Sequence, residues 1–88
     1  MKLELFTSQT CTNCRTLKRH LKEILDEIGE DYDMVVSEKS IEDGEVMAEL
    51  LMLNVDSVPL IRIEGKLFGW DRTRDKTSLK KILTEHKK

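Results

Sequence analysis

The 88-residue sequence lacks the features that mark several specialised classes of protein. It has no excess of basic residues, and its formal net charge of −2 argues against electrostatic binding to nucleic acid. No apolar run approaches the roughly 20 residues that span a bilayer. Met1 and Lys2 lead directly into a strand-like run, so we expect no signal peptide. We therefore predict a cytoplasmic protein that binds neither nucleic acid nor membrane.

Cysteine, proline and tryptophan are also scarce, with two, one and one copies. Because the cytoplasm keeps thiols reduced, we do not expect a stable structural disulfide. An apolar content of 39% and a charged content of 36% are typical of a globular rather than a disordered chain. This length corresponds to one domain, and we predict a single monomeric domain over residues 1–88.

Hydrophobic spacing predicts seven secondary-structure elements. They are a strand at 2–6, a helix at 12–28, a strand at 32–36, a helix between Ser40–Asp43 and Asn54, strands at 60–63 and 66–68, and a helix from about Thr73. A helical crossover makes the first two strands parallel. The Glu64-Gly65 connection predicts an antiparallel hairpin, and we expect a type I turn with Gly65 left-handed. The order βαβαββα predicts an α/β fold with a four-stranded mixed sheet and helices on both faces.

Each predicted helix has an apolar side that should face the sheet. In the second helix this side should carry Val46, Met47, Leu50, Leu51 and Leu53, while Met52 lies off it and should be exposed. In the first and last helices the corresponding residues are Leu17, Leu21, Ile24, Leu25, Ile28, Leu79, Ile82 and Leu83.

Cys11 and Cys14 form a Cys-x-x-Cys pair directly behind the first predicted strand. A zinc site usually takes four ligands, and neither His20 nor His86 has zinc-finger spacing, so we expect no metal site. A purely structural disulfide across so short a loop would add very little stability through chain entropy. We favour the third interpretation, a redox pair at a strand-to-helix junction.

The predicted start of a helix suits a reactive thiol. Cys11 should lie at the N-cap or in the first turn, where free backbone N–H groups and the helix dipole favour a thiolate. Cys14 follows one turn later on the same face, further inside the helix. We therefore predict that Cys11 attacks a disulfide and that Cys14 resolves the mixed disulfide.

Charges in the first predicted helix run against its dipole, with bases early and acids late. Two interpretations stay open. In one, the early cations favour the thiolate of Cys11. In the other, they form a solvated face with Arg19–Glu23 and Lys22–Asp26 pairs. The early cations are Arg15, Lys18, Arg19 and Lys22.

Two stretches, LFTSQTCTNC and VDSVPLIRIEGKLFGW, resemble the glutaredoxin branch of the thioredoxin superfamily. The resemblance covers nearly the whole chain in element order. It is most specific at Cys11-x-x-Cys14 and at Ser57-Val58-Pro59, which the hairpin and Gly69 follow. It implies a thioredoxin fold and thiol–disulfide oxidoreductase activity. The electrons would reside in the thiols of Cys11 and Cys14, which form a redox-active disulfide when oxidised, so no bound cofactor is expected.

The resemblance also implies a substrate-binding surface around Cys11. In the family, the proline that matches Pro59 has a cis peptide bond beside the reactive cysteine, and the residue matching Val58 pairs its backbone with the substrate chain. Trp70 should either flank Cys11 or cover the sheet edge. Thr12 and Asn13 should either stabilise the thiolate through hydrogen bonds or be neutral. The candidate substrate-binding residues are Thr10, Thr12, Asn13, Val58, Pro59, Gly69 and Trp70.

Departures from the family pattern bear on the substrate. Glutaredoxins that use glutathione usually carry a cation where Ser8 stands and a second glycine where Trp70 stands. Thioredoxins usually have tryptophan where Thr10 stands and a buried aspartate where Leu5 stands. Small glutaredoxin-like redoxins that serve ribonucleotide reductase share this weaker pattern and take electrons from a reductase protein of the thioredoxin-reductase type. We favour thioredoxin-like reduction of protein disulfides; the alternatives are glutathione-dependent activity and a non-redox binding module.

Overall fold

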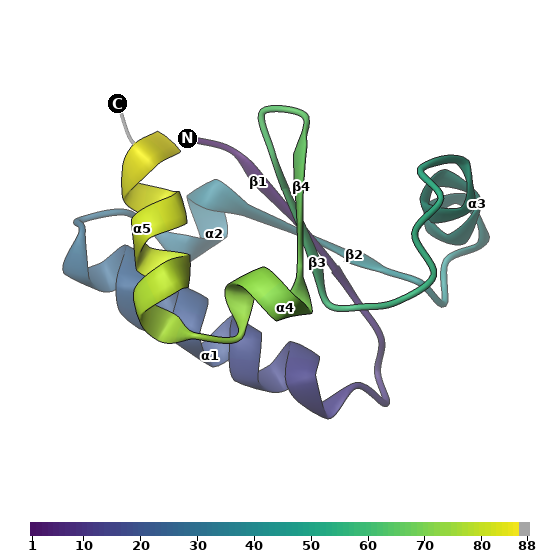
Figure 1. Ribbon diagram of the computed structural model, residues 1–88, viewed down its shortest axis with the longest axis horizontal. Helices are drawn as coiled ribbons and strands as arrows, with labels where there is room; N and C mark the ends of the chain where they lie inside the picture. The colour runs from purple at the N-terminus through teal and green to yellow at the C-terminus, as the bar shows by residue number, and fades with distance from the viewer. Residues whose placement is uncertain (87–88) are drawn as a thin grey trace.

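The computed structural model describes residues 1–86, and its strands form one sheet in the order β2-β1-β3-β4 (Figure 1). Strand β1 is parallel to β2 and antiparallel to β3, which pairs with β4 in a hairpin. This is the predicted four-stranded mixed sheet. Within the described residues, no helix is long and apolar enough to cross a membrane. The elements are β1 (Leu3–Thr7), α1 (Thr12–Glu27), α2 (Tyr32–Val35), β2 (Val36–Ser40), α3 (Gly44–Met52), β3 (Leu60–Ile63), β4 (Lys66–Gly69), α4 (Trp70–Thr73) and α5 (Lys76–His86).

Alternation along the strands divides the buried residues between the two faces of the sheet. Leu3 and Leu5 of β1 pair with Ile63 and Ile61 of β3 and belong to the larger cluster, which includes the apolar sides of α1 and α5. On the other face, Phe6, Leu60 and Leu50 of α3 form a smaller cluster. Figure 1 shows α1, α4 and α5 gathered together and α3 apart from them. The prediction of helices on both faces is therefore confirmed.

Helix α1 matches its prediction closely. Its inward residues are completely buried, and Gly29 follows its C-cap with a positive φ of 78°. Glu23, one half of the Arg19–Glu23 pair of the second interpretation, forms its salt bridge with Lys76 of α5 at 2.6 Å, and Arg19 adds a weaker attraction. Lys22 likewise lies over the ring of Tyr32, 5.3 Å from its centroid. The buried residues of α1 are Cys14, Leu17, Leu21, Ile24 and Leu25.

The predicted strand at 32–36 is wrong. Residues Tyr32–Val35 form the single helical turn α2, capped by the Asp31 carboxylate, which accepts a hydrogen bond from the Asp33 N–H at 3.0 Å. Strand β2 begins only at Val36, which pairs with Leu3 of β1. As an edge strand, β2 exposes several polar side chains, so it lacks the apolar pattern by which strands are recognised.

The hairpin turn also differs from its prediction. Gly65 is left-handed as expected, with φ of 82°, but Glu64 also has a positive φ of 51°. The two-residue connection is therefore a type I′ turn, whose twist matches that of the flanking strands. The Glu64 carboxylate lies 3.3 Å from Nδ1 of His86 in α5, a tertiary contact that no local pattern reveals.

Helix α3 begins at Gly44, with Asp43 as its N-cap, and ends before Asn54, which has a φ of 58°. Its predicted apolar side is wrong in part. Leu50 is 3% exposed, but Met47 and Leu51 are 39% and 66% exposed. The apolar contact between α3 and the sheet is the small cluster, and Glu49 of α3 adds ion pairs with Lys39 of β2 and Arg62 of β3, so a narrow apolar stripe is enough.

The helix predicted from about Thr73 is α5, which begins at Lys76, and the short helix α4 comes before it. Thr73 is fully buried in α4, where its hydroxyl donates to the Gly69 carbonyl at 3.0 Å. Leu79, Ile82 and Leu83 of α5 are buried as predicted.

Candidate active site

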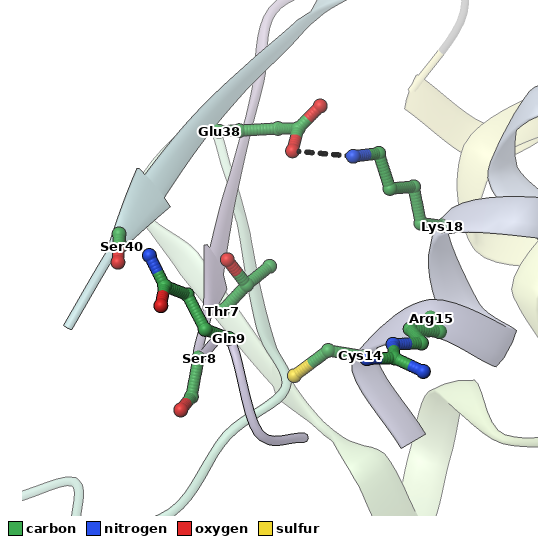
Figure 2. Close-up of a pocket in the computed structure, with 8 residues that line it drawn as sticks. All are labelled: Thr7, Ser8, Gln9, Cys14, Arg15, Lys18, Glu38 and Ser40. Carbon is green, nitrogen blue, oxygen red and sulfur yellow. Dashed lines mark ion pairs between the residues drawn. The ribbon is translucent and has the colours of Figure 1, made fainter. Parts of the chain in front are cut away.

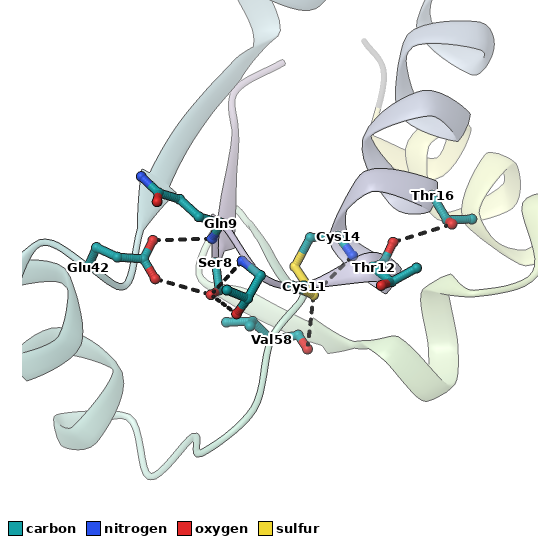
Figure 3. The surroundings of a disulfide bond; sticks show 9 residues. Ser8, Gln9, Cys11, Thr12, Cys14, Thr16, Glu42 and Val58 are labelled. Atoms are coloured by element: carbon teal, nitrogen blue, oxygen red, sulfur yellow. Dashed lines mark hydrogen bonds between the residues drawn. A yellow bond between two sulfur atoms is a disulfide. The ribbon is translucent and has the colours of Figure 1, made fainter.

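A disulfide joins Cys11 and Cys14 at the N-terminus of α1 (Figure 3). Cys11 is the N-cap residue, and its Sγ accepts a hydrogen bond from the Cys14 N–H at 3.0 Å. Cys11 is partly exposed, whereas Cys14 is only 3% exposed. When the disulfide is reduced, this N–H and the positive end of α1 favour a thiolate on Cys11. The geometry therefore matches the predicted places of both sulfurs.

The turn between β1 and α1 fixes the position of Cys11. The Cys11 N–H donates to the Ser8 carbonyl at 3.2 Å, which closes a turn of four residues. The Ser8 hydroxyl lies 3.2 Å from that of Thr10. Because β1 is held in the middle of the sheet, this turn gives Cys11 a rigid support.

Val58 and Pro59 lie beside Cys11 although they are far away in sequence. The Val58 carbonyl oxygen is 3.9 Å from Sγ of Cys11, and the Val58–Pro59 peptide bond is cis, as the resemblance implied. Pro59 is buried, and Val58 packs against the small cluster that contains Phe6. The small cluster therefore holds this loop next to the sulfur.

Sequence reasoning missed Glu42, which we had assigned only to a helix start. Its carboxylate accepts hydrogen bonds from the Ser8 hydroxyl at 3.1 Å and from the Gln9 N–H at 3.3 Å. These contacts join the turn before Cys11 to the connection between β2 and α3 (Figure 3). No signal in the sequence links positions 33 and 34 residues apart.

A cavity of about 300 Å³ lies next to Cys14, and Ser8, Gln9 and Ser40 also line it. Figure 2 shows Arg15 and Lys18 of α1 on one side of it. Lys18 is paired with Glu38 of β2 at 2.9 Å. Burial would raise the pKa of Glu38, but hydrogen bonds from Lys18 and Tyr32 outweigh it and the pKa lies below its ordinary value. Because Glu38 neutralises Lys18, Arg15 is the cation of this group best placed to favour a thiolate.

The other predicted site residues divide into two groups. Thr10, Thr12 and Asn13 are exposed around the disulfide. The N-cap hydrogen bond is made by Cys11 rather than by Thr12 or Asn13. Gly69 lies opposite Leu60 in the hairpin, and Trp70 packs against the larger core cluster. Binding of substrate by these residues, and by Val58 and Pro59, stays a prediction.

Two further candidates for the site are His20 and a group of metal ligands. His20 is half-buried, and its Nδ1 has no hydrogen-bond partner within the described structure. Across residues 1–86, no three His, Cys, Asp or Glu side chains are grouped so that they could hold a metal ion.

The chain belongs to the thioredoxin-domain family, whose model matches residues 1–84. A mutant of the thioredoxin-like protein BC3987 is similar in structure, with a TM-score of 0.65 and 20% sequence identity, over 93% of this chain and 99% of that one. Thioredoxin 1 from the thermophilic eubacterium Thermosipho africanus TCF52B has a TM-score of 0.59 and 17% identity over 97% of each chain. No curated protein matches the sequence. The predicted thioredoxin fold is confirmed, while the glutaredoxin branch stays a prediction.

Proposed function

We propose that this chain is a small thiol–disulfide oxidoreductase that reduces disulfides in partner proteins. The observation that carries the proposal is the unequal exposure of the two cysteines at the start of α1. Cys11 is the partly exposed N-cap, and Cys14 is 3% exposed one turn later. The attacking sulfur must reach the partner, whereas the resolving sulfur needs to reach only the mixed disulfide.

One cycle transfers two electrons from the dithiol to the partner. The Cys11 thiolate attacks one sulfur of the partner's disulfide, and the other partner sulfur leaves as a thiolate that takes up a proton. Cys14 then loses its proton and attacks Sγ of Cys11, which forms the Cys11–Cys14 disulfide and releases the second partner thiol. A reductase protein or a small thiol then supplies two electrons to restore the dithiol.

Protein disulfides are a better substrate for this site than glutathione. Ser8 stands where glutathione-using glutaredoxins usually have a cation, and its hydroxyl donates to the Glu42 carboxylate. Ser8 thus supplies no cation, and the Glu42 carboxylate places a negative charge at this turn, which disfavours an anionic tripeptide. In this proposal the protein works as a monomer in cytoplasmic redox homeostasis and takes electrons from a thioredoxin-reductase-type protein. Ribonucleotide reductase is a candidate partner.

The electron donor can be tested with the oxidised protein and NADPH. One arm contains a thioredoxin reductase, and the other contains glutathione with glutathione reductase. We expect NADPH oxidation in the first arm, followed by insulin reduction. Turnover with glutathione alone would instead support the glutaredoxin alternative.

Two cysteine variants test the roles of the sulfurs. We expect Cys11→Ser to abolish insulin reduction, because no attacking thiolate remains. Cys14→Ser should accumulate the mixed disulfide, visible as a reducible band on a non-reducing gel. Normal insulin reduction by Cys11→Ser would remove the attacking role of Cys11, whereas a wild-type protein that reduces no insulin would favour a binding module.

A further inference from the structure

Glu42 places a carboxylate in direct contact with the turn that leads to Cys11. Besides Ser8 and Gln9, it accepts a hydrogen bond from the hydroxyl of Ser40, at the end of β2. Together these three donors hold the side chain of an exposed residue in one place (Figure 3). The position of the charge is thus determined by the fold.

The negative charge of Glu42 has no cationic partner among the described residues. The nearest lysine in sequence, Lys39, instead pairs with Glu4 at 2.6 Å and with Glu49 at 3.6 Å. Hydrogen bonding from Ser40 lowers the pKa of Glu42, against a smaller opposing effect of burial, and Ser8 and the Gln9 N–H lower it further. The carboxylate is therefore ionised at neutral pH, and its charge acts on whatever approaches the site.

This charge is held against the turn that carries the attacking sulfur. The hydrogen bond from the Cys11 N–H to the Ser8 carbonyl brings the two Cα atoms within about 7 Å of each other. Charges separated by up to about 8 Å, the Debye length at physiological ionic strength, still interact. A charged group beside the disulfide of a substrate comes close to this turn when Cys11 attacks, so the charge of Glu42 acts on it.

We propose that Glu42 is a specificity-determining residue, whose fixed negative charge slows attack on anionic disulfides, glutathione disulfide included, relative to cationic ones. The substrates that suit the site are disulfides with basic residues nearby. This inference rests on the proposed function. Arg15, which lines the cavity beside Cys14, has the opposite charge. The effect of Glu42 is therefore measured by removing the charge of Glu42 while Arg15 stays in place.

The test uses reduced protein in single turnover with small disulfides of different charge. Cystamine is cationic, 2-hydroxyethyl disulfide is neutral, and dithiodiglycolate and glutathione disulfide are anionic. In each reaction one dithiol reduces one disulfide to two thiols and becomes the Cys11–Cys14 disulfide, so no other reductant is needed. The measured quantity is the ratio of the anionic to the cationic rate constant. This ratio cancels any change in the pKa of Cys11.

Glu42→Gln keeps an oxygen acceptor for Ser8 and Gln9 but removes the charge. We expect it to raise the ratio about two- to fivefold at low salt, with the neutral substrate between the two. Glu85→Gln is the matched control, because Glu85 is exposed on α5 and the change in net charge is the same. It should leave the ratio unchanged.

Salt gives a second measurement that needs no variant. In the wild-type protein, raising the ionic strength to about 1 M should raise the ratio toward the value of Glu42→Gln, because screening is then nearly complete. An unchanged ratio in Glu42→Gln, or an equal change in Glu85→Gln, would overturn the proposed role of Glu42 but leave the proposed function of the protein standing. A wild-type protein that reduces none of these disulfides would overturn the proposed function as well.

Discussion

The two faces of the sheet are held together in different ways. On one face, α1 and α5 cover Leu3, Leu5, Ile61 and Ile63 with a continuous apolar cluster. On the other face, α3 covers Phe6 and Leu60, and charged side chains lie beyond this small cluster. There the Arg62 guanidinium donates two hydrogen bonds to the Glu4 carboxylate, at 2.6 and 2.7 Å.

The two faces should therefore have different roles: one supports the disulfide, and the other positions groups that a partner protein would contact. The large cluster holds α1, and with it the disulfide, against the sheet. The small cluster holds Val58 beside Cys11, and the connection before α3 holds Glu42 against the turn before Cys11. Most of the stability should therefore come from the first face, while contacts to a partner depend more on the second.

The largest effect should come from Leu21→Ala. Leu21 is completely buried in α1, and we expect the change to lower the free energy of unfolding by about 3–4 kcal/mol through lost burial and a cavity. Urea denaturation measures it. Because the disulfide lies elsewhere in α1, disulfide reduction by the folded fraction should be unchanged. A loss below that of Leu50→Ala would contradict the comparison.

Leu50→Ala makes the same change on the other face. Leu50 is 3% exposed, but hydrophobic neighbours such as Val46 and Val58 are only partly buried, so the site can relax. We expect a loss of about 2 kcal/mol. Because Val58 shares this cluster, single-turnover reduction should slow severalfold. An unchanged rate would mean that the small cluster does not position Val58.

The ion pair between Glu4 and Arg62 on the second face should make the stability of the fold depend on pH in the acid range. The hydrogen bond from Arg62 lowers the pKa of Glu4 from 4.5 to about 2, with a further contribution from Lys39 and against the opposing effect of burial. A lowered pKa stabilises the fold above pH 4.5, and this contribution is lost as the pH falls toward 2. We expect a loss of about 1–3 kcal/mol over this range.

Glu4→Gln should remove that part of the pH dependence, as thermal melts between pH 2 and pH 6 would show. Glu85→Gln, on the exposed side of α5, should keep the wild-type profile. An identical acid profile for wild type and Glu4→Gln would mean that the Glu4–Arg62 pair contributes no pH-dependent stability.

The smallest effect should come from the ion pairs between α1 and α5. Lys76 and Glu23 are about half exposed, so solvent and salt screen their attraction. Lys76→Ala should lower the melting temperature slightly at low salt and not at high salt. A large loss that persists in high salt would instead indicate that Lys76 acts through packing.

Patterns of local origin predicted much of this molecule. The apolar spacing of α1, the alternation in β1 and the proline before β3 each depend on near neighbours, and the structure has all three. The Cys11–Cys14 pair could also be predicted, because its chemistry needs only a helix start behind a strand. The prediction of a strand at 32–36 failed for two reasons. Asp31 caps a helical turn there, and the true edge strand, β2, needs no apolar pattern.

By itself, the sequence determined the order of the main elements, the hydrophobic face of α1 and the reactive pair at its start, since these rest on periodicity and spacing along the chain. Only the tertiary structure decided which groups surround Cys11. Val58 lies next to Cys11, and Glu42 binds the turn before it, through contacts between segments more than 30 residues apart. Such contacts are set by how the two faces pack on the sheet, so no local pattern reports them.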